Sequence, residues 1–252
     1  MLYFIGLGLY DEKDLSLRGL EIIKKCSEVY AELYTSFFHG DLKKLEELSG
    51  KKIRILGRED LEEKSSKLIE KAKKENVAIL VPGDPMIATT HAAILIDAMK
   101  KGIKTKVVHS SSIYSGIGET GLHIYKFGRT VSLPYPQDNY MPESPYLYIK
   151  ENLDLGLHTL VLLDVKAEQK KFMSINEALR ILLEIEERKR LGVITAEKEV
   201  LGISRLGSDD QLIRYGAVKK LIELDFGKPP HSLVIPGKLH FMEEEMLNFF
   251  RI

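Results

Sequence analysis

The 252-residue sequence predicts an α/β fold with two α/β domains and a ligand cleft between them. Through the first half, short apolar segments alternate with amphipathic ones, a pattern typical of parallel strands joined by crossover helices. The second half also contains strand and helix patterns, but its turn residues are denser and its spacing is less regular. The Ser-rich turn "HSSSIYSGIGETG" separates the two halves and predicts domains at 1–112 and 113–252.

The first half starts with an apolar strand, Leu2 to Leu7. This segment is too short to cross a membrane and lacks a basic signal-peptide start, so we expect neither anchor nor signal. The segments that follow are a helix near 17–26, strands in "EVYAELYT" and "KKIRIL", a helix within 61–74, a strand at 77–81, a helix after Asp84 and a strand in "KTKVVH". This order predicts a mainly parallel, doubly wound sheet.

The second half contains four predicted strands and two predicted helices. The strands are "TVSLPY", "HTLVLLDV", "EVLGISRL" and "HSLVIP", and the helices are expected near 175–188 and 217–224. Together these segments are sufficient for a second α/β domain.

Composition excludes several classes of function. Lys plus Arg equals Asp plus Glu at 37 each, so no net charge favours nucleic acid or an anionic membrane as a partner. Cys26 is the only cysteine, which excludes an internal disulfide and a multi-cysteine metal site, and favours a cytoplasmic location. Charged residues make up 29% of the chain, which together with few amides predicts a thermophilic source.

Several catalytic motifs are missing from the sequence. Gly6 and Gly8 follow the first strand, but Asp11 stands where a dinucleotide fingerprint requires its third glycine. No G-x-x-x-x-G-K-[ST] phosphate loop, H-E-x-x-H metal motif or G-x-S-x-G serine elbow occurs. We therefore predict no metal site, kinase or serine hydrolase.

The turn "VPGDP" connects the strand 77–81 to the following helix and places Asp84 at the carboxyl end of that strand. In open α/β sheets this edge is where small ligands usually bind. The structural alternative is that Asp84 caps the next helix, with Pro85 at its first position.

Four segments show a family resemblance: "FIGLGLYDEKDLSLRGLEIIKKCSEVYAE", "VPGDPMIATTH", "GLHIYKFG" and "DFGKPPHSLVIPGKLHFMEEE". Together they resemble the diphthine synthases, a branch of the tetrapyrrole methylase superfamily, along nearly the whole chain. The resemblance implies a homodimeric S-adenosylmethionine-dependent methyltransferase with two domains of the tetrapyrrole methylase type, the cofactor lying between them and S-adenosylhomocysteine as product. Its implied substrate is the 3-amino-3-carboxypropyl-histidine of translation elongation factor 2, trimethylated to diphthine in peptidyl-diphthamide biosynthesis.

The resemblance also implies which residues contact the cofactor. These are Leu9, Asp84, Ile87, Ser112, Ile113, Leu163, Leu206 and His231. An anionic Asp84 suits a ligand that carries a sulfonium and an ammonium, and the aliphatic positions suit an adenine ring. Without the resemblance, Leu163 would be interpreted as strand core and His231 as a surface turn residue.

Methyl transfer from a sulfonium needs alignment and a neutral amine rather than a metal or a covalent intermediate. We assign no catalytic residue. The trimethylated product is a permanent cation, which a carboxylate or an aromatic face can stabilise. Candidates for that role, not distinguishable from structural residues, are Tyr114, Glu119, Tyr125 and Asp164.

The aromatic segments "TGLHIYKFG" and "LPYPQDNYMPESPYLY" predict a surface for substrate docking in the second half. The alternative is that their tyrosines, Tyr125, Tyr135, Tyr140, Tyr146 and Tyr148, pack the domain core or a dimer contact. Two other functions stay open: a tetrapyrrole or precorrin methyltransferase, and a noncatalytic nucleotide-binding module using the Gly6 and Gly8 turn.

Overall fold

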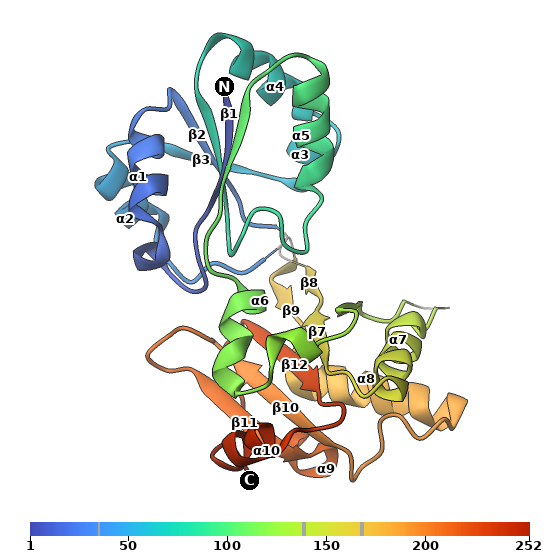
Figure 1. The fold of residues 1–252 in the computed structure, drawn as a ribbon. Helices are drawn as coiled ribbons and strands as arrows, with labels where there is room; N and C mark the ends of the chain where they lie inside the picture. Colours follow the sequence, from blue (N-terminus) through green and yellow to red (C-terminus); the bar gives the residue numbers. More distant parts are fainter. Residues whose placement is uncertain (35, 138–139, 167–168) are drawn as a thin grey trace. The chain divides into compact units, whose positions relative to one another are not determined.

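The structure, a computed structural model, describes residues 1–34, 36–137, 140–166 and 169–252 (Figure 1). The chain divides into two compact units: the first is formed by Met1–Gly116, and the second by Ile117–Lys166 with Lys170–Ile252. Each unit contains a five-stranded sheet together with helices. The predicted α/β class is therefore confirmed.

The first unit alternates strands and helices along the chain. Its elements are β1 (Leu2–Gly6), η1 (Glu12–Asp14), α1 (Leu17–Lys24), β2 (Glu28–Glu32), α2 (Leu42–Ser49), β3 (Ile53–Leu56), α3 (Arg58–Glu62), α4 (Ser65–Lys74), β4 (Val77–Val81), α5 (His91–Lys100), β5 (Thr105–Val108) and α6 (Ile113–Gly116). The strands form a sheet of order β3-β2-β4-β1-β5 in which every pair is parallel. The predicted parallel sheet is confirmed.

Alternating residues of the central strands divide the first unit's core between the two sheet faces, because successive strand side chains point to opposite sides. On one face Phe4 and Ile79 pack with Ile69 of α4 and Ile94 of α5. On the other face Ile5 packs in a cluster that includes Ile23 of α1 and Leu45 of α2. Figure 1 shows these helix pairs on opposite sides of the sheet.

The second unit starts with short helical turns and contains a mixed sheet. Its elements are η2 (Ile117–Thr120), η3 (Ile124–Lys126), β6 (Val131–Leu133), α7 (Ser144–Asp154), β7 (Thr159–Leu163), β8 (Val165–Lys166), β9 (Lys171–Phe172), α8 (Ile175–Lys189), β10 (Glu199–Ser204), β11 (Leu212–Ala217), α9 (Val218–Leu221), β12 (His231–Ile235) and α10 (Phe241–Asn248). The sheet order is β11-β10-β12-β7-β6, with antiparallel pairs except for β6 and β7, which are parallel.

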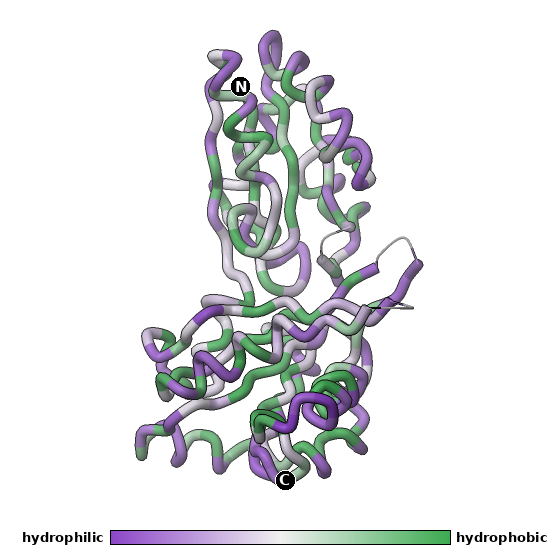
Figure 2. Tube along the Cα trace, turned by 90° about the vertical axis from the view of Figure 1, so that its right-hand side faces the viewer, coloured by the Kyte–Doolittle hydropathy of each residue, from purple (hydrophilic) through white to green (hydrophobic). Residues whose placement is uncertain are grey.

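One large cluster forms the core of the second unit. It joins Val161 of β7 and Leu233 of β12 to Leu179 and Leu182 of α8 and to Tyr146 of α7. Figure 2 shows hydrophobic and hydrophilic residues alternating along the helical coils, as expected where one face of a helix packs against a core.

Some elements differ from the sequence-based expectation. The helix expected directly after Asp84 starts only at His91, because Ala88 adopts a left-handed backbone conformation with φ of 52° that interrupts any earlier helix. Strand β11 and helices α2, α7 and α10 were not predicted. In α7 the proline near the start is compatible with a helix, because a first-turn residue needs no backbone N–H donor.

Candidate functional site

Three turns meet at the carboxyl edge of the first unit's sheet, because β4, β1 and β5 are adjacent and parallel. Leu7 to Leu9 follow β1, Pro82 to Asp84 follow β4, and His109 to Ser112 follow β5. The first two turns are joined by backbone hydrogen bonds: Gly83 N donates to Gly8 O at 2.8 Å, and Gly8 N donates to Gly83 O at 3.3 Å.

The glycines at this edge lack a side chain for different physical reasons. A Cβ on Gly6 would come 2.6 Å from both Gly83 O and Ser110 Cβ, and one on Gly8 would come 2.2 Å from Asp14 Cβ. These two glycines therefore permit close packing within the protein. Gly83 has φ of 69°, and the nearest atom to a Cβ there would be Ser112 Cβ at 3.6 Å. A Cβ on Gly83 would therefore make only ordinary contact with Ser112, and it is the left-handed backbone rather than crowding that favours glycine there.

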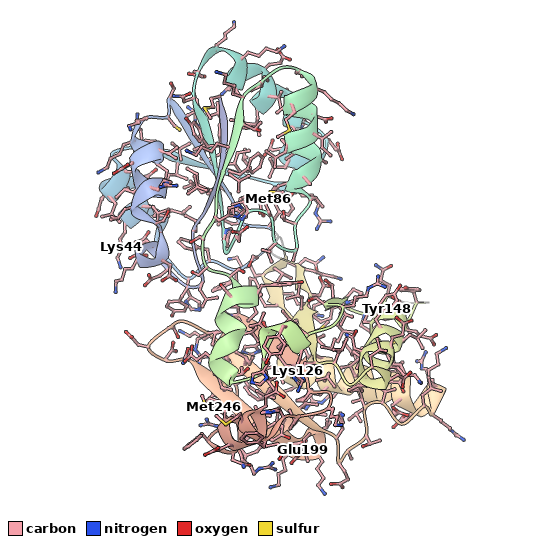
Figure 3. All side chains as sticks on the ribbon, viewed as in Figure 1. Lys44, Met86, Lys126, Tyr148, Glu199 and Met246 are labelled. Carbon is pink, nitrogen blue, oxygen red and sulfur yellow. The ribbon has the colours of Figure 1, made fainter. Side chains whose placement is uncertain are left out.

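The carboxylate of Asp84 binds its own turn and the residues that follow β5, although Asp84 is only 7% exposed. Oδ1 accepts from Met86 N at 2.9 Å, and Oδ2 accepts from Ser110 N at 3.1 Å and lies 2.9 Å from His109 Nδ1. Met86 is labelled in Figure 3. Because α5 starts at His91, the interpretation of Asp84 and Pro85 as helix cap and first helical residue is wrong. Asp84 instead places a carboxylate at the carboxyl edge of the first sheet.

The other predicted cofactor residues of this unit lie on the same turns. Leu9 follows Gly8, while Ile87 closes the Asp84 turn by donating its N–H to Asp84 O at 3.2 Å. Ser112 is buried, and Ile113 is the first residue of α6. The side chains of Leu9, Ile87 and Ile113 are half-buried. The structure therefore brings these predicted residues and Asp84 to one edge of the first sheet.

The three remaining predicted residues gather at one edge of the second unit's sheet. His231 is the first residue of β12 and pairs with Ser204, the last residue of β10. Ser232 pairs with Leu162, next to Leu163 at the end of β7. Leu206 follows β10 by two residues and is 4% exposed.

Leu163 and His231 each had a structural alternative: strand core for Leu163 and a surface turn for His231. Leu163 is half-buried and packs against the core cluster, as a strand residue would. His231 is half-buried in a strand rather than placed in a surface turn. Burial lowers the pKa of His231, although a hydrogen bond to the Lys228 carbonyl acts in the opposite direction.

The four candidates for stabilising a cationic product have separate surroundings. Asp164 directly follows β7 and accepts from Tyr135 N at 2.9 Å, so it is the candidate next to Leu163. Glu119 accepts from Gln211 Nε2. Tyr125 is 81% exposed, with its hydroxyl 3.0 Å from His123 Nδ1, and Tyr114 is 37% exposed.

The buried carboxylate of Glu243 connects two of the segments that carry the family resemblance. The sequence alone did not identify it as a functional residue. Glu243 accepts from His123 N at 2.8 Å and from His240 N at 2.7 Å, lies 3.0 Å from His158 Nε2 and binds the ammonium of Lys126. Figure 3 labels Lys126. Burial acts to raise the pKa of Glu243, but the hydrogen bonds, led by that from Lys126, lower it to about 2.

His158 lies next to this carboxylate in a single tautomer. Its Nδ1 accepts from Gly237 N at 3.0 Å, so Nε2 carries the proton that it donates to Glu243. Burial lowers the pKa of His158. The segments "GLHIYKFG" and "PGKLHFMEEE" thus form a structural network. The only sequence signal for it was the capping pattern from His240 to Glu243.

Among the residues that the structure describes, no group of three His, Cys, Asp or Glu side chains could hold a metal ion. No helix in the same ranges is both long and apolar enough to cross a membrane.

Comparison with known proteins identifies the family. The family model for Tetrapyrrole (Corrin/Porphyrin) Methylases matches residues 1–222. The chain belongs to the tetrapyrrole methylase family. A diphthine synthase of Methanocaldococcus jannaschii is 49% identical over 252 residues, covering 99% of this chain and 98% of that protein. A diphthine synthase of Methanococcus maripaludis strain C5 is also 49% identical over 250 residues, with coverage of 99% and 98%.

A solved structure supports the same assignment within the tetrapyrrole methylase family. A crystal structure of diphthine synthase superimposes with a TM-score of 0.90 at 40% identity, covering 99% of this chain and 95% of that one. The chain therefore lies in the diphthine synthase branch of the tetrapyrrole methylase family. Members of this family are S-adenosylmethionine-dependent methyltransferases, so the prediction of a methyltransferase is confirmed and the noncatalytic alternative is wrong.

Proposed function

We propose that this protein is an S-adenosylmethionine-dependent N-methyltransferase of diphthamide biosynthesis. Its substrate is the 3-amino-3-carboxypropyl-histidine of translation elongation factor 2, and its product is the trimethylated amine, diphthine. The observation that carries the proposal is similarity to diphthine synthases over 99% of the chain.

The residues at the first unit's sheet edge fit the chemistry of this cofactor. Asp84 supplies a carboxylate fixed by three donors, which suits a ligand bearing a sulfonium and an ammonium. Gly83 beside it has no side chain, which lets a ligand approach the backbone. Half-buried Leu9, Ile87 and Ile113 offer apolar surface for an adenine ring. We propose that these residues, with Ser112, Leu163, Leu206 and His231, contact the cofactor.

When bound, S-adenosylmethionine supplies an electrophilic methyl group with a neutral leaving group. The protein must therefore hold the substrate amine in line and in its neutral form. An ordinary alkylamine is protonated at neutral pH, with a pKa of about 10 by analogy with lysine. Exclusion of water by the apolar side chains would lower the pKa of that amine, because burial disfavours the charged form. After the third methylation the nitrogen has no lone pair, which ends the series chemically.

The proposal also includes a homodimer that works in the cytoplasm without nucleic acid. Equal numbers of acidic and basic residues, 37 each, give no long-range attraction to polyanions. Sedimentation at several concentrations tests the dimer; a monomer mass throughout would contradict that part alone.

Transfer of labelled methyl groups tests the activity. The purified protein is incubated with labelled S-adenosylmethionine and elongation factor 2 that carries the aminocarboxypropyl histidine. Label is expected on that histidine, and mass spectrometry of the peptide gives the number of methyl groups. Label on a precorrin instead would support a tetrapyrrole methylase. Cofactor binding without transfer to either substrate would contradict the proposal.

A further inference from the structure

Arg205 directly follows β10 and has an unusual backbone. Its φ is 50°, in the left-handed region, where a residue with a Cβ is strained. The side chain is also buried, since Arg205 is only 8% exposed. Such strain persists only where the surrounding contacts fix it, and it is concentrated at functional sites.

The guanidinium of Arg205 binds a nearby loop. Nη1 donates to the carbonyls of Phe226 at 2.7 Å and Lys228 at 2.8 Å, and it lies 2.6 Å from the hydroxyl of Ser204. The backbone N–H of Arg205 donates to Pro230 O at 2.9 Å. Arg205 thus holds the segment 226–230, which leads into β12.

The same side chain also fixes its own turn. Nη2 donates to Asp210 O at 2.8 Å, and Nε forms an ion pair with Asp210 Oδ2 at 2.8 Å. Leu206 lies within this turn. A Cβ on Gly227 would come 2.9 Å from Nη1, so the guanidinium requires a residue without a side chain there.

Arg205 and His231 share one acceptor. His231 Nε2 lies 3.1 Å from Lys228 O, the carbonyl that also accepts from Arg205. A carbonyl only accepts, so Nε2 carries the proton and Nδ1 is left as the acceptor of the ring. Among the described residues Nδ1 is buried without a hydrogen-bond partner.

We propose that Arg205 is a positioning residue: by fixing the Lys228 carbonyl and the turn of Leu206, it sets the place of Leu206 and the Nε2–H tautomer of His231. The inference rests on the proposed function, because these two residues serve there as cofactor contacts. The contacts of the guanidinium with this loop and with Asp210 hold the strained backbone of Arg205 in place.

Arg205→Lys tests this role, because lysine keeps the charge but loses the planar set of donors. Arg214→Lys on β11 is the matched control. Calorimetry with S-adenosylhomocysteine, at a temperature where circular dichroism shows folded protein, is expected to give about tenfold weaker binding for Arg205→Lys, as for loss of a charge-assisted hydrogen bond. The control should bind as the wild type does. At saturating cofactor, kcat of Arg205→Lys should stay within about twofold, because the residue acts on binding.

A second readout does not depend on ligand binding. Nitrogen-15 spectra of the histidine rings, with His231 assigned by its loss in His231→Gln, should show Nε2–H in the wild type and a mixture of tautomers in Arg205→Lys. Unchanged cofactor affinity together with an unchanged His231 tautomer would overturn the inference. Failure of the wild type to bind S-adenosylhomocysteine would contradict the proposed function instead, and the tautomer would still decide the role of Arg205.

If Arg205→Lys does not fold, Ser204→Ala tests the same role of Arg205. Ser204 Oγ lies 2.8 Å from Phe226 O and 3.2 Å from Lys228 O, can donate its one proton to either carbonyl, and accepts from Arg205 Nη1, so its loss weakens the same cluster with little change in volume. A measurable loss of cofactor affinity and a mixed His231 tautomer would support the inference. Wild-type values for both would overturn it.

Discussion

His109 Nδ1 lies 2.9 Å from Asp84 Oδ2, which ties the residue after β5 to the turn after β4. The two residues are 25 positions apart in the sequence. The imidazole is 71% exposed, whereas the carboxylate is almost buried. The His109 ring therefore faces solvent while it holds the Asp84 carboxylate in place.

Asp84→Asn should weaken cofactor binding by about tenfold or more, because it removes the charge opposite a cationic ligand. It should also cost about 1–3 kcal/mol of stability, because one amide oxygen cannot accept from both Met86 N and Ser110 N. Calorimetric binding and thermal denaturation measure the two effects. Asp97→Asn on the exposed side of α5 is the control. Unchanged affinity would return Asp84 to a purely structural role.

Gly6→Ala and Gly83→Ala should behave differently. The first places a methyl group 2.6 Å from two atoms and is expected to cost about 1–3 kcal/mol or more of stability by overpacking. The second meets no close atom but strains a backbone at φ of 69°, at a cost of about 1–2 kcal/mol. Only Gly83→Ala should lower cofactor affinity beyond its effect on folding. A smaller loss of stability for Gly6→Ala than for Gly83→Ala in chemical denaturation would contradict a packing role for Gly6. A cofactor affinity lowered by Gly6→Ala and not by Gly83→Ala, measured by calorimetry, would contradict a ligand-facing role for Gly83.

Acid should remove the contribution of Glu243 to stability. Its pKa is about 2 in the folded protein against 4.5 for an ordinary glutamate, so the contribution is complete above about pH 4.5 and is lost as the pH falls toward 2. This shift corresponds to about 3 kcal/mol at neutral pH. Glu243→Gln should therefore be destabilised near neutrality and approach the wild type near pH 2, as measured by urea unfolding. Exposed Glu245→Gln is the control; a constant difference at all pH values would argue against the buried network.

The tyrosines of the second half divide into core and surface residues. Tyr146 is fully buried and donates to Glu186 Oε2 at 2.6 Å, so the core alternative is correct for it, and Tyr135 is also buried. Tyr125 and Tyr140 are 81% and 57% exposed and remain candidates for substrate docking. Asp138 and Asn139 of the predicted docking segment lie outside the described residues.

Alanine substitutions should separate these two groups. Tyr146→Ala is expected to cost about 3–5 kcal/mol of stability, because it empties a core position. Tyr125→Ala and Tyr140→Ala should change stability by about 0.5 kcal/mol or less while reducing methyl transfer to the protein substrate. Cofactor affinity and sedimentation mass should stay unchanged in both. Normal methyl transfer would remove these two residues from the docking surface.

Local pattern was sufficient to predict most strands and the position of Asp84. Apolar runs such as Val77–Val81 require burial on both faces, and their alternation with helices predicts a parallel sheet, so Asp84 had to lie at its carboxyl edge. The start of α5 could not be predicted in the same way. It depends on the left-handed turn at Ala88 and on an Asp84 carboxylate already occupied by the residues after β5.

By itself the sequence determined the alternation of elements, the family and the residues at the two sheet edges, because periodicity and motifs are properties of neighbouring residues. Tertiary structure alone decided which groups those residues meet. Glu243 accepts from the backbone of His123, 120 positions away, and Arg205 holds carbonyls more than 20 positions along the chain. Such partners depend on which helices, turns and loops the packing of the whole unit brings together, and no local pattern in the sequence encodes that.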